Sequence, residues 1–191
     1  MLDLDGNDRY TSHDFSIGFG GPQGVGAIID VSGHDHYQCG NTYPSVYNAH
    51  DVHSGKPDDP LYQYDCFGLG TGSGQRVLTK KVEWQAYSLK GGWGILLDIE
   101  GNDHYDSANF SQRQANFFGA GMKLDLQGND EHYSPRYGHV ASAHFGVGLF
   151  IGHQGDDLYG SSSTFYNGGV AWDNKCEPDD RCRQRPRHLC L

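Results

Sequence analysis

Aspartates recur at two fixed positions of this sequence, and their carboxylates can bind cations or transfer protons. The stretch from Leu97 to Tyr105 (LDIEGNDHY) holds both positions, Asp98 before a glycine and Asp103 after it. The first position is filled by Asp3, Asp30, Asp98 and Asp125. The second is filled by Asp8, Asp35, Asp103, Asp130 and Asp157. Clustered carboxylates are the ligands that calcium prefers, so these nine aspartates are candidate metal ligands.

The stretches recur at a fixed period. The turn glycines Gly6 and Gly33 are 27 residues apart, and so are Gly101, Gly128 and Gly155 in succession. Fixed periods of this length are typical of solenoids and repeat arrays, and the units are rich in glycine and β-formers. A propeller blade needs a longer unit. The sequence therefore predicts an all-β fold, a right-handed parallel β-solenoid (β-helix) of 27-residue coils with one inserted loop.

Alternation within each unit predicts which side chains face the interior. The apolar residues on either side of the first aspartate are expected to point inward, and that aspartate outward. These apolar residues are Ile29, Leu97, Leu124 and Ile151 before it, and Leu4, Val31, Ile99 and Leu126 after it. Ile28, Leu96 and Phe150 would then form an outer apolar stripe, interrupted by Lys123. Tyr10, Tyr37, Tyr105 and Tyr159 would stack as a ladder, with a one-residue slip at His132–Tyr133.

The period breaks between Gly33 and Gly101, whose separation is not a whole number of repeat lengths. We therefore expect an insertion at about 40–64, followed by a shortened unit at about 78–97. The domain is predicted to span 1–172. The segment 173–191 is polar, with cysteine and arginine, and is predicted to be a disordered tail or a cap. Loops often carry function, so a unique site is expected between Gly40 and Lys81.

The turn sequences resemble a known family. Gly152–Gly160 (GHQGDDLYG) and the shorter Gly-Asn-Asp-x-Tyr turns are similar to the haemolysin-type (RTX) nonapeptide, whose glycine-rich turns bind calcium in a parallel β-roll. The resemblance covers one nine-residue turn in each unit. It implies calcium as cofactor, with the second-position aspartates from Asp8 to Asp157 as matching ligands. Backbone N–H groups are the alternative partners of these carboxylates.

Composition narrows the class of protein. The net charge of −10 argues against a nucleic-acid partner, and no apolar run is long enough for a membrane span. The five cysteines, Cys39, Cys66, Cys176, Cys182 and Cys190, show neither a zinc spacing nor a disulfide framework. We expect an extracellular or cell-surface protein without a visible signal peptide.

The function favoured by the sequence is a non-catalytic structural or binding module with a carbohydrate or protein ligand. End-to-end or lateral self-association would cover its open strand edges. The alternative is a carbohydrate-active enzyme, a lyase or glycoside hydrolase, with its site near the insertion. Its acids would come from Asp14, Asp51, Asp58, Asp59, Asp65 and Glu83. Histidine pairs His34/His36 and His50/His53 are predicted to lie on a solvated face, with a site for zinc or another transition metal as the alternative.

Overall fold

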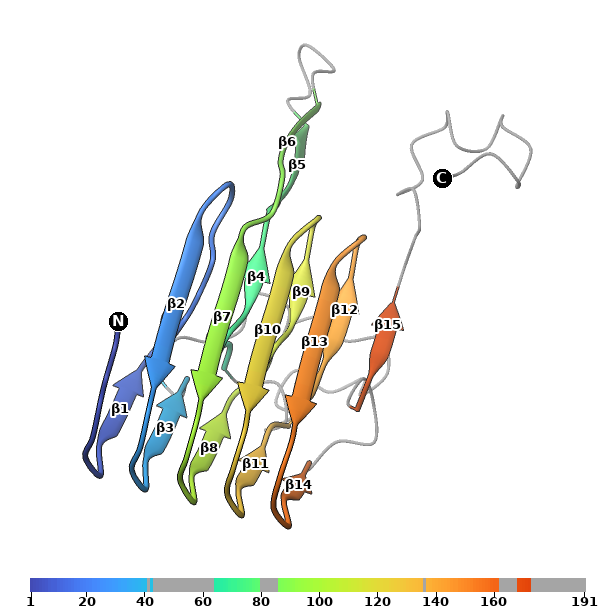
Figure 1. Cartoon of the computed structure of the whole chain (residues 1–191). Coiled ribbons are helices and arrows are strands. Elements are labelled where there is room, and N and C mark those ends of the chain that lie inside the picture. Colours follow the sequence, from blue (N-terminus) through green and yellow to red (C-terminus); the bar gives the residue numbers. More distant parts are fainter. Residues whose placement is uncertain (41, 43–63, 80–85, 136, 162–167, 173–191) are drawn as a thin grey trace.

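The computed structural model describes residues 1–40, 42, 64–79, 86–135, 137–161 and 168–172. This part of the chain is all β, and none of it forms a helix that could span a membrane. Its strands lie in three separate parallel sheets and one antiparallel pair. Figure 1 shows the sheets side by side, with chain order running from β1 at one end to β14 and β15 at the other.

The first sheet has the order β2 (Val25–Asp30), β7 (Trp93–Asp98), β10 (Ala120–Asp125) and β13 (Val147–Gly152). The second has β1 (Arg9–Ser12), β3 (His36–Cys39), β8 (His104–Ser107), β11 (Glu131–Tyr133) and β14 (Leu158–Gly160). The third has β4 (Gly72–Ser73), β9 (Ala115–Asn116), β12 (Ala141–Ala143) and β15 (Val170–Trp172).

Strand pairing follows the period in the sequence. Arg9 pairs with His36, and Lys123 pairs with Phe150, each pair separated by one repeat length. Across the break in the period, Val25 pairs directly with Trp93. The shortened unit expected at 78–97 is therefore wrong. Part of that stretch is an antiparallel pair, β5 (Gln75–Thr79) and β6 (Ala86–Leu89), which protrudes beyond the parallel sheets (Figure 1).

The predicted right-handed β-solenoid of 27-residue coils is also wrong. The described residues form three separate sheets, and no strand ladder continues from one sheet into the next. A physical reason lies in the connections, where non-glycine residues adopt left-handed φ angles that end an extended strand. Phe110 (φ 57°) and Gln112 (φ 50°) precede β9, and Phe117 (φ 47°) follows it. A coil of regular alternation does not predict such residues.

The side-chain facing was predicted one residue out of step. Asp30, Asp98 and Asp125 were expected to point outward, but they are 2–3 % exposed. Ile28 and Leu96, assigned to an outer stripe, are buried, whereas Ile151 is exposed. A shift of one residue moves every side chain of a strand to the other face. Assigning the aspartates to the wrong face therefore reversed the predicted facing of the apolar residues beside them.

Two aromatic ladders run across the stacked units, the first along the strands of the second sheet and the second along the connections. Tyr10, Tyr37 and Tyr105 stack with 4.7 Å between successive ring centroids, which confirms this part of the predicted ladder. His132 continues it, 4.7 Å from Tyr105 and 4.9 Å from Tyr159, so a histidine replaces the tyrosine and no slip occurs. The second ladder contains Phe15, Phe67, Phe110 and Tyr137. Much of the remaining interior is polar, because the three middle units bury both of their repeat aspartates.

Candidate functional site

The second-position aspartates form one ladder along the turns. The amide N–H of Asp8 donates to Oδ1 of Asp35 at 2.6 Å, and that of Asp35 donates to Oδ1 of Asp103 at 2.6 Å. Asp103 donates to Asp130 at 2.7 Å, and Asp130 to Asp157 at 3.2 Å. Each bond joins one unit to the next. The backbone thereby offsets the repulsion between stacked carboxylates, and one oxygen of each acceptor is occupied.

The residue before each of these aspartates forms a parallel ladder. The Asn7 side chain accepts the amide N–H of His34 at 2.8 Å, and Asn102 accepts that of Asn129 at 2.8 Å. His34, expected on a solvated face, is exposed but takes part in this ladder, because its Nδ1 accepts the amide N–H of Asn102 at 3.0 Å. The asparagine side chains therefore hold successive units together by hydrogen bonds.

The first-position aspartates face the tyrosine ladder. Tyr37 donates its hydroxyl to Asp30 at 2.8 Å, and Tyr105 donates to Asp98 at 2.5 Å. Tyr10 donates to Asp30, and also to Asp3, at 2.9 Å. Burying a carboxylate is costly unless hydrogen bonds replace its water, and the tyrosine hydroxyls supply those bonds.

Burial changes the protonation of three second-position aspartates. It raises the pKa of Asp103 to about 9, with the charge of Asp98 as the next cause. It also raises the pKa of Asp130 to about 7 and that of Asp35 to about 6, against backbone N–H bonds that lower both. Protons therefore neutralise part of this carboxylate column near neutral pH.

Buried positive charge lies beside His132, on Lys123 of β10 and on Arg113 in the connection before β9. The Lys123 Nζ lies 2.8 Å from Oδ2 of Asp125 and 3.4 Å from Nδ1 of His132. The Nη2 atom of Arg113 lies 3.3 Å from the same Nδ1. The guanidinium carbon of Arg113 lies 3.6 Å from the centroid of the Phe150 ring. Lys123, His132 and Arg113 are at most 1 % exposed. Burial lowers the pKa of Lys123 to about 8 and that of Arg113 to about 10, and holds the pKa of His132 far below its ordinary value.

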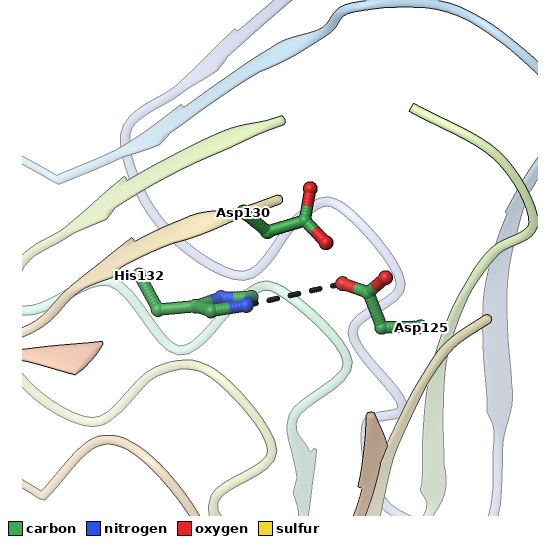
Figure 2. A group of neighbouring side chains, drawn as sticks. All are labelled: Asp125, Asp130 and His132. Carbon is green, nitrogen blue, oxygen red and sulfur yellow. Dashed lines mark ion pairs between the residues drawn. The ribbon is translucent and has the colours of Figure 1, made fainter. Parts of the chain in front are cut away.

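Asp125, Asp130 and His132 come together as a potential metal-ligand group. One ligand atom from each lies within 4.8 Å of the others, and Figure 2 shows the three side chains converging. The His132 Nε2 lies 3.8 Å from Oδ2 of Asp125. Two of these residues were predicted as ligands, and His132 was missed. Its place in the tyrosine column is the signal that could have identified it as buried.

A separate groove of about 260 Å³ lies on the outward face of the second sheet. It is lined by His104, Asp106, Glu131, His132, Tyr133, Leu158 and Gly160. Gly160 pairs with Tyr133, and its missing side chain leaves space beside that ring. The His104 Nδ1 lies 3.1 Å from Oε2 of Glu131.

The groove residues vary between units, unlike the turn residues. In register, Glu131 lies beside His104 and Leu158, and Tyr133 beside Asp106. The groove is far in sequence from the expected site at 40–81. Residues 41 and 43–63, with the His50/His53 pair and most of the insertion, lie outside the described residues, as do Glu83 and 173–191.

A disulfide joins Cys39 and Cys66, with 5.4 Å between their Cα atoms. The sequence did not predict this pair. The signal was their separation of 27 residues, one period, although the chain between them does not follow the period. Both cysteines are fully buried, and they belong to the apolar cluster of Ile28, Leu69 and Leu96.

Comparisons with protein-family models, with curated proteins and with solved structures find no match for this chain. The resemblance to haemolysin-type repeats therefore stays a prediction. The candidate site is therefore defined by its geometry alone. It consists of an outward-facing groove and, next to it, the buried charged side chains around His132.

Proposed function

We propose that this chain is a non-catalytic binding module whose outward groove on β8, β11 and β14 takes a carbohydrate. The observation that supports this is the groove itself, lined by residues that differ from unit to unit. The repeated aspartates, asparagines and tyrosines are engaged in ladders that hold the units together. In a repeat protein, the side chains that differ between units are the ones that can determine which ligand binds.

The groove has the chemistry of a small sugar site. Tyr133 is 40 % exposed, so its ring can cover the apolar face of a sugar. Glu131, Asp106 and His104 supply acceptors and a switchable donor for hydroxyl groups. A volume of about 260 Å³ lies just below the range of about 300–1,000 Å³ typical of ligand pockets, which suits one sugar ring. Two carboxylates favour neutral or amino sugars over uronic acids.

Calorimetric titration with neutral, amino-sugar and uronic-acid oligosaccharides tests this function. We expect a neutral or amino sugar to bind, and Tyr133→Ala and Glu131→Gln each to weaken binding by at least about tenfold. Glu100→Gln, which alters an exposed turn carboxylate outside the groove, is the matched control. The proposal fails if no sugar binds, or if binding is unchanged by both groove variants; a protein ligand is then the next candidate.

A carbohydrate-active enzyme is the second candidate, because Asp106 and Glu131 lie in the same groove. Glycoside hydrolysis uses two carboxyl groups, one as acid and one as base or nucleophile. Release of reducing ends from the sugar that binds separates the two functions. An enzyme would lose turnover in Asp106→Asn while keeping affinity, whereas a binding module would show no turnover in the unaltered chain.

Calcium remains a proposal for the turn column. Oδ2 atoms of Asp103 and Asp130 lack hydrogen-bond partners and are buried, which leaves oxygen available to a cation. In the other direction, each Oδ1 accepts a backbone N–H, so the turns can close without metal. Thermal unfolding with calcium and with excess EGTA tests the proposal. A bound calcium predicts a markedly lower melting temperature in EGTA, and equal melting temperatures would refute it.

Location and association are inferred from two further features. The Cys39–Cys66 disulfide favours an oxidising, extracellular or cell-surface setting. Among the described residues, the end strands β1, β13 and β14 pair with a strand on one side only, and such open edges favour end-to-end association. Sedimentation across a concentration series tests this association, and a constant monomer mass would refute it.

A further inference from the structure

Lys123 occupies an apolar position of the repeat. In the first sheet it pairs with Leu96 on one side and Phe150 on the other, and Ile28 lies one strand further. Ile28 and Leu96 are at most 3 % exposed, and Lys123 is 1 % exposed. An ammonium in such a column needs a partner, since an isolated buried charge is strongly unfavourable.

That partner is the carboxylate at the end of the same strand. The Nζ lies 2.8 Å from Oδ2 of Asp125 and 3.1 Å from the centroid of the Tyr105 ring, whose face attracts cations. In the preceding unit the equivalent residue is Leu96, and the Asp98 carboxylate there has no lysine on its own strand. The fourth unit thus carries its own cation.

The same neighbourhood holds a metal-ligand set. Asp125, Asp130 and His132 supply two carboxylates and an imidazole, donors that suit zinc-type ions. Oδ2 of Asp130 and Nε2 of His132 are buried and without hydrogen-bond partners, in residues that are 1 % exposed. Two atoms that can bind a metal are therefore directed into this cluster.

The cations oppose metal binding in two ways. Lys123 and Arg113 bring positive charge close to the ligand atoms. Both also face Nδ1 of His132, and both are donors, so Nδ1 has to accept and the hydrogen of the neutral ring lies on Nε2. A metal at Nε2 needs the lone pair there, which requires the opposite tautomer.

We propose that Lys123 is the resident cation of the Asp125–Asp130–His132 cluster and excludes zinc-type ions, which would bind through Nε2 of His132. The side chain at position 123 then decides whether this unit is neutralised by an ammonium or by a zinc-type ion. This inference does not rest on the proposed sugar site. The two sites share His132, which also lines the groove, but neither Tyr133 nor Glu131 belongs to the buried cluster.

Titration with Co²⁺, whose visible spectrum reports an imidazole and carboxylate environment, tests the proposal. The unaltered chain should give no such spectrum. Lys123→Met, which extends the apolar column, should bind one Co²⁺ at least about tenfold more tightly, because a like charge has been removed from the site. Adding His132→Phe should abolish that binding. Lys123→Arg, which keeps the charge, should behave as the unaltered chain.

Folding is controlled separately. Lys123→Met leaves Asp125 without its counter-ion, so Lys123→Met with Asp125→Asn should recover the melting temperature without binding Co²⁺. Arg113→Val, which introduces the residue of the equivalent Val140 position, is added to Lys123→Met as a further variant. The proposal is overturned if the unaltered chain binds Co²⁺ through His132. It is equally overturned if Lys123→Met, alone and with Arg113→Val, folds but gains no Co²⁺ affinity.

Discussion

Asp103→Asn should stabilise the protein at alkaline pH. Burial raises the pKa of Asp103 to about 9, against about 3.9 in an unfolded chain, so the folded state holds this proton more tightly. Its contribution to stability is therefore complete below about pH 4 and is lost as the pH rises towards 9. Each bound proton changes the free energy of unfolding by about 1.4 kcal/mol per pH unit, or about 4 kcal/mol between pH 5 and pH 8.

The asparagine reproduces the protonated acid without titrating. Its oxygen can accept the amide N–H of Asp35, a bond of 2.6 Å, and its amide adds no negative charge beside Asp98. Urea unfolding at pH 5, 6, 7 and 8, with EGTA in every buffer, measures the effect. We expect near-equal stability at pH 5 and a more stable variant at pH 8. Asp156→Asn, at an exposed turn, is the matched control. Parallel pH profiles for Asp103→Asn and the unaltered chain would refute the reasoning.

Three further changes test the ladders and the cross-link. Tyr105→Phe removes a buried hydroxyl from a carboxylate 2.5 Å away and should cost about 1–3 kcal/mol in urea unfolding; an unchanged midpoint would contradict the bond. Gly128→Ala places a Cβ 1.9 Å from the backbone oxygen of Gly101 in the preceding turn and should cost at least about 2 kcal/mol, whereas Gly24→Ala, with 3.4 Å of space, should cost less than half as much. Reduction of Cys39–Cys66, which spans 27 residues, should cost about 3.5 kcal/mol, checked by unfolding with and without dithiothreitol and by thiol titration.

The period was the part of the structure most open to sequence reasoning. Equal spacing of Gly101, Gly128 and Gly155 predicts strands paired one repeat length apart, and Asp98 indeed pairs with Asp125 in register. Stacked tyrosines followed from the same spacing. The closed coil did not, because residues such as Phe110 and Phe117 adopt left-handed φ angles that their residue types do not predict. The β5–β6 pair was missed because its length was interpreted as a shortened unit.

The facing of the strands was wrong for a different reason. Alternation along a strand defines its two faces but does not show which face is buried. The prediction placed the more hydrophobic face inside. Here the inward column carries Asp30, Asp98 and Asp125, and tyrosine hydroxyls further along the chain are the partners of Asp30 and Asp98. Lys123 was assigned to the outer stripe for the same reason. The signal that could have corrected the facing is the tyrosine that follows Asp30 and Asp98 at the same spacing, in the next strand.

A repeat protein separates structural residues from functional ones by variation between its own units. The turn aspartates are shared by successive units, and each shared residue has a hydrogen bond to its neighbour that explains it. Lys123 among Leu96 and Phe150, and Glu131 between His104 and Leu158, break their columns. Stacking does not require these departures, so each needs a reason of its own. For Lys123 the reason is its ion pair with the buried carboxylate of Asp125. Glu131 is exposed beside the groove, where its contact within the chain is His104, and the proposed sugar ligand would account for it.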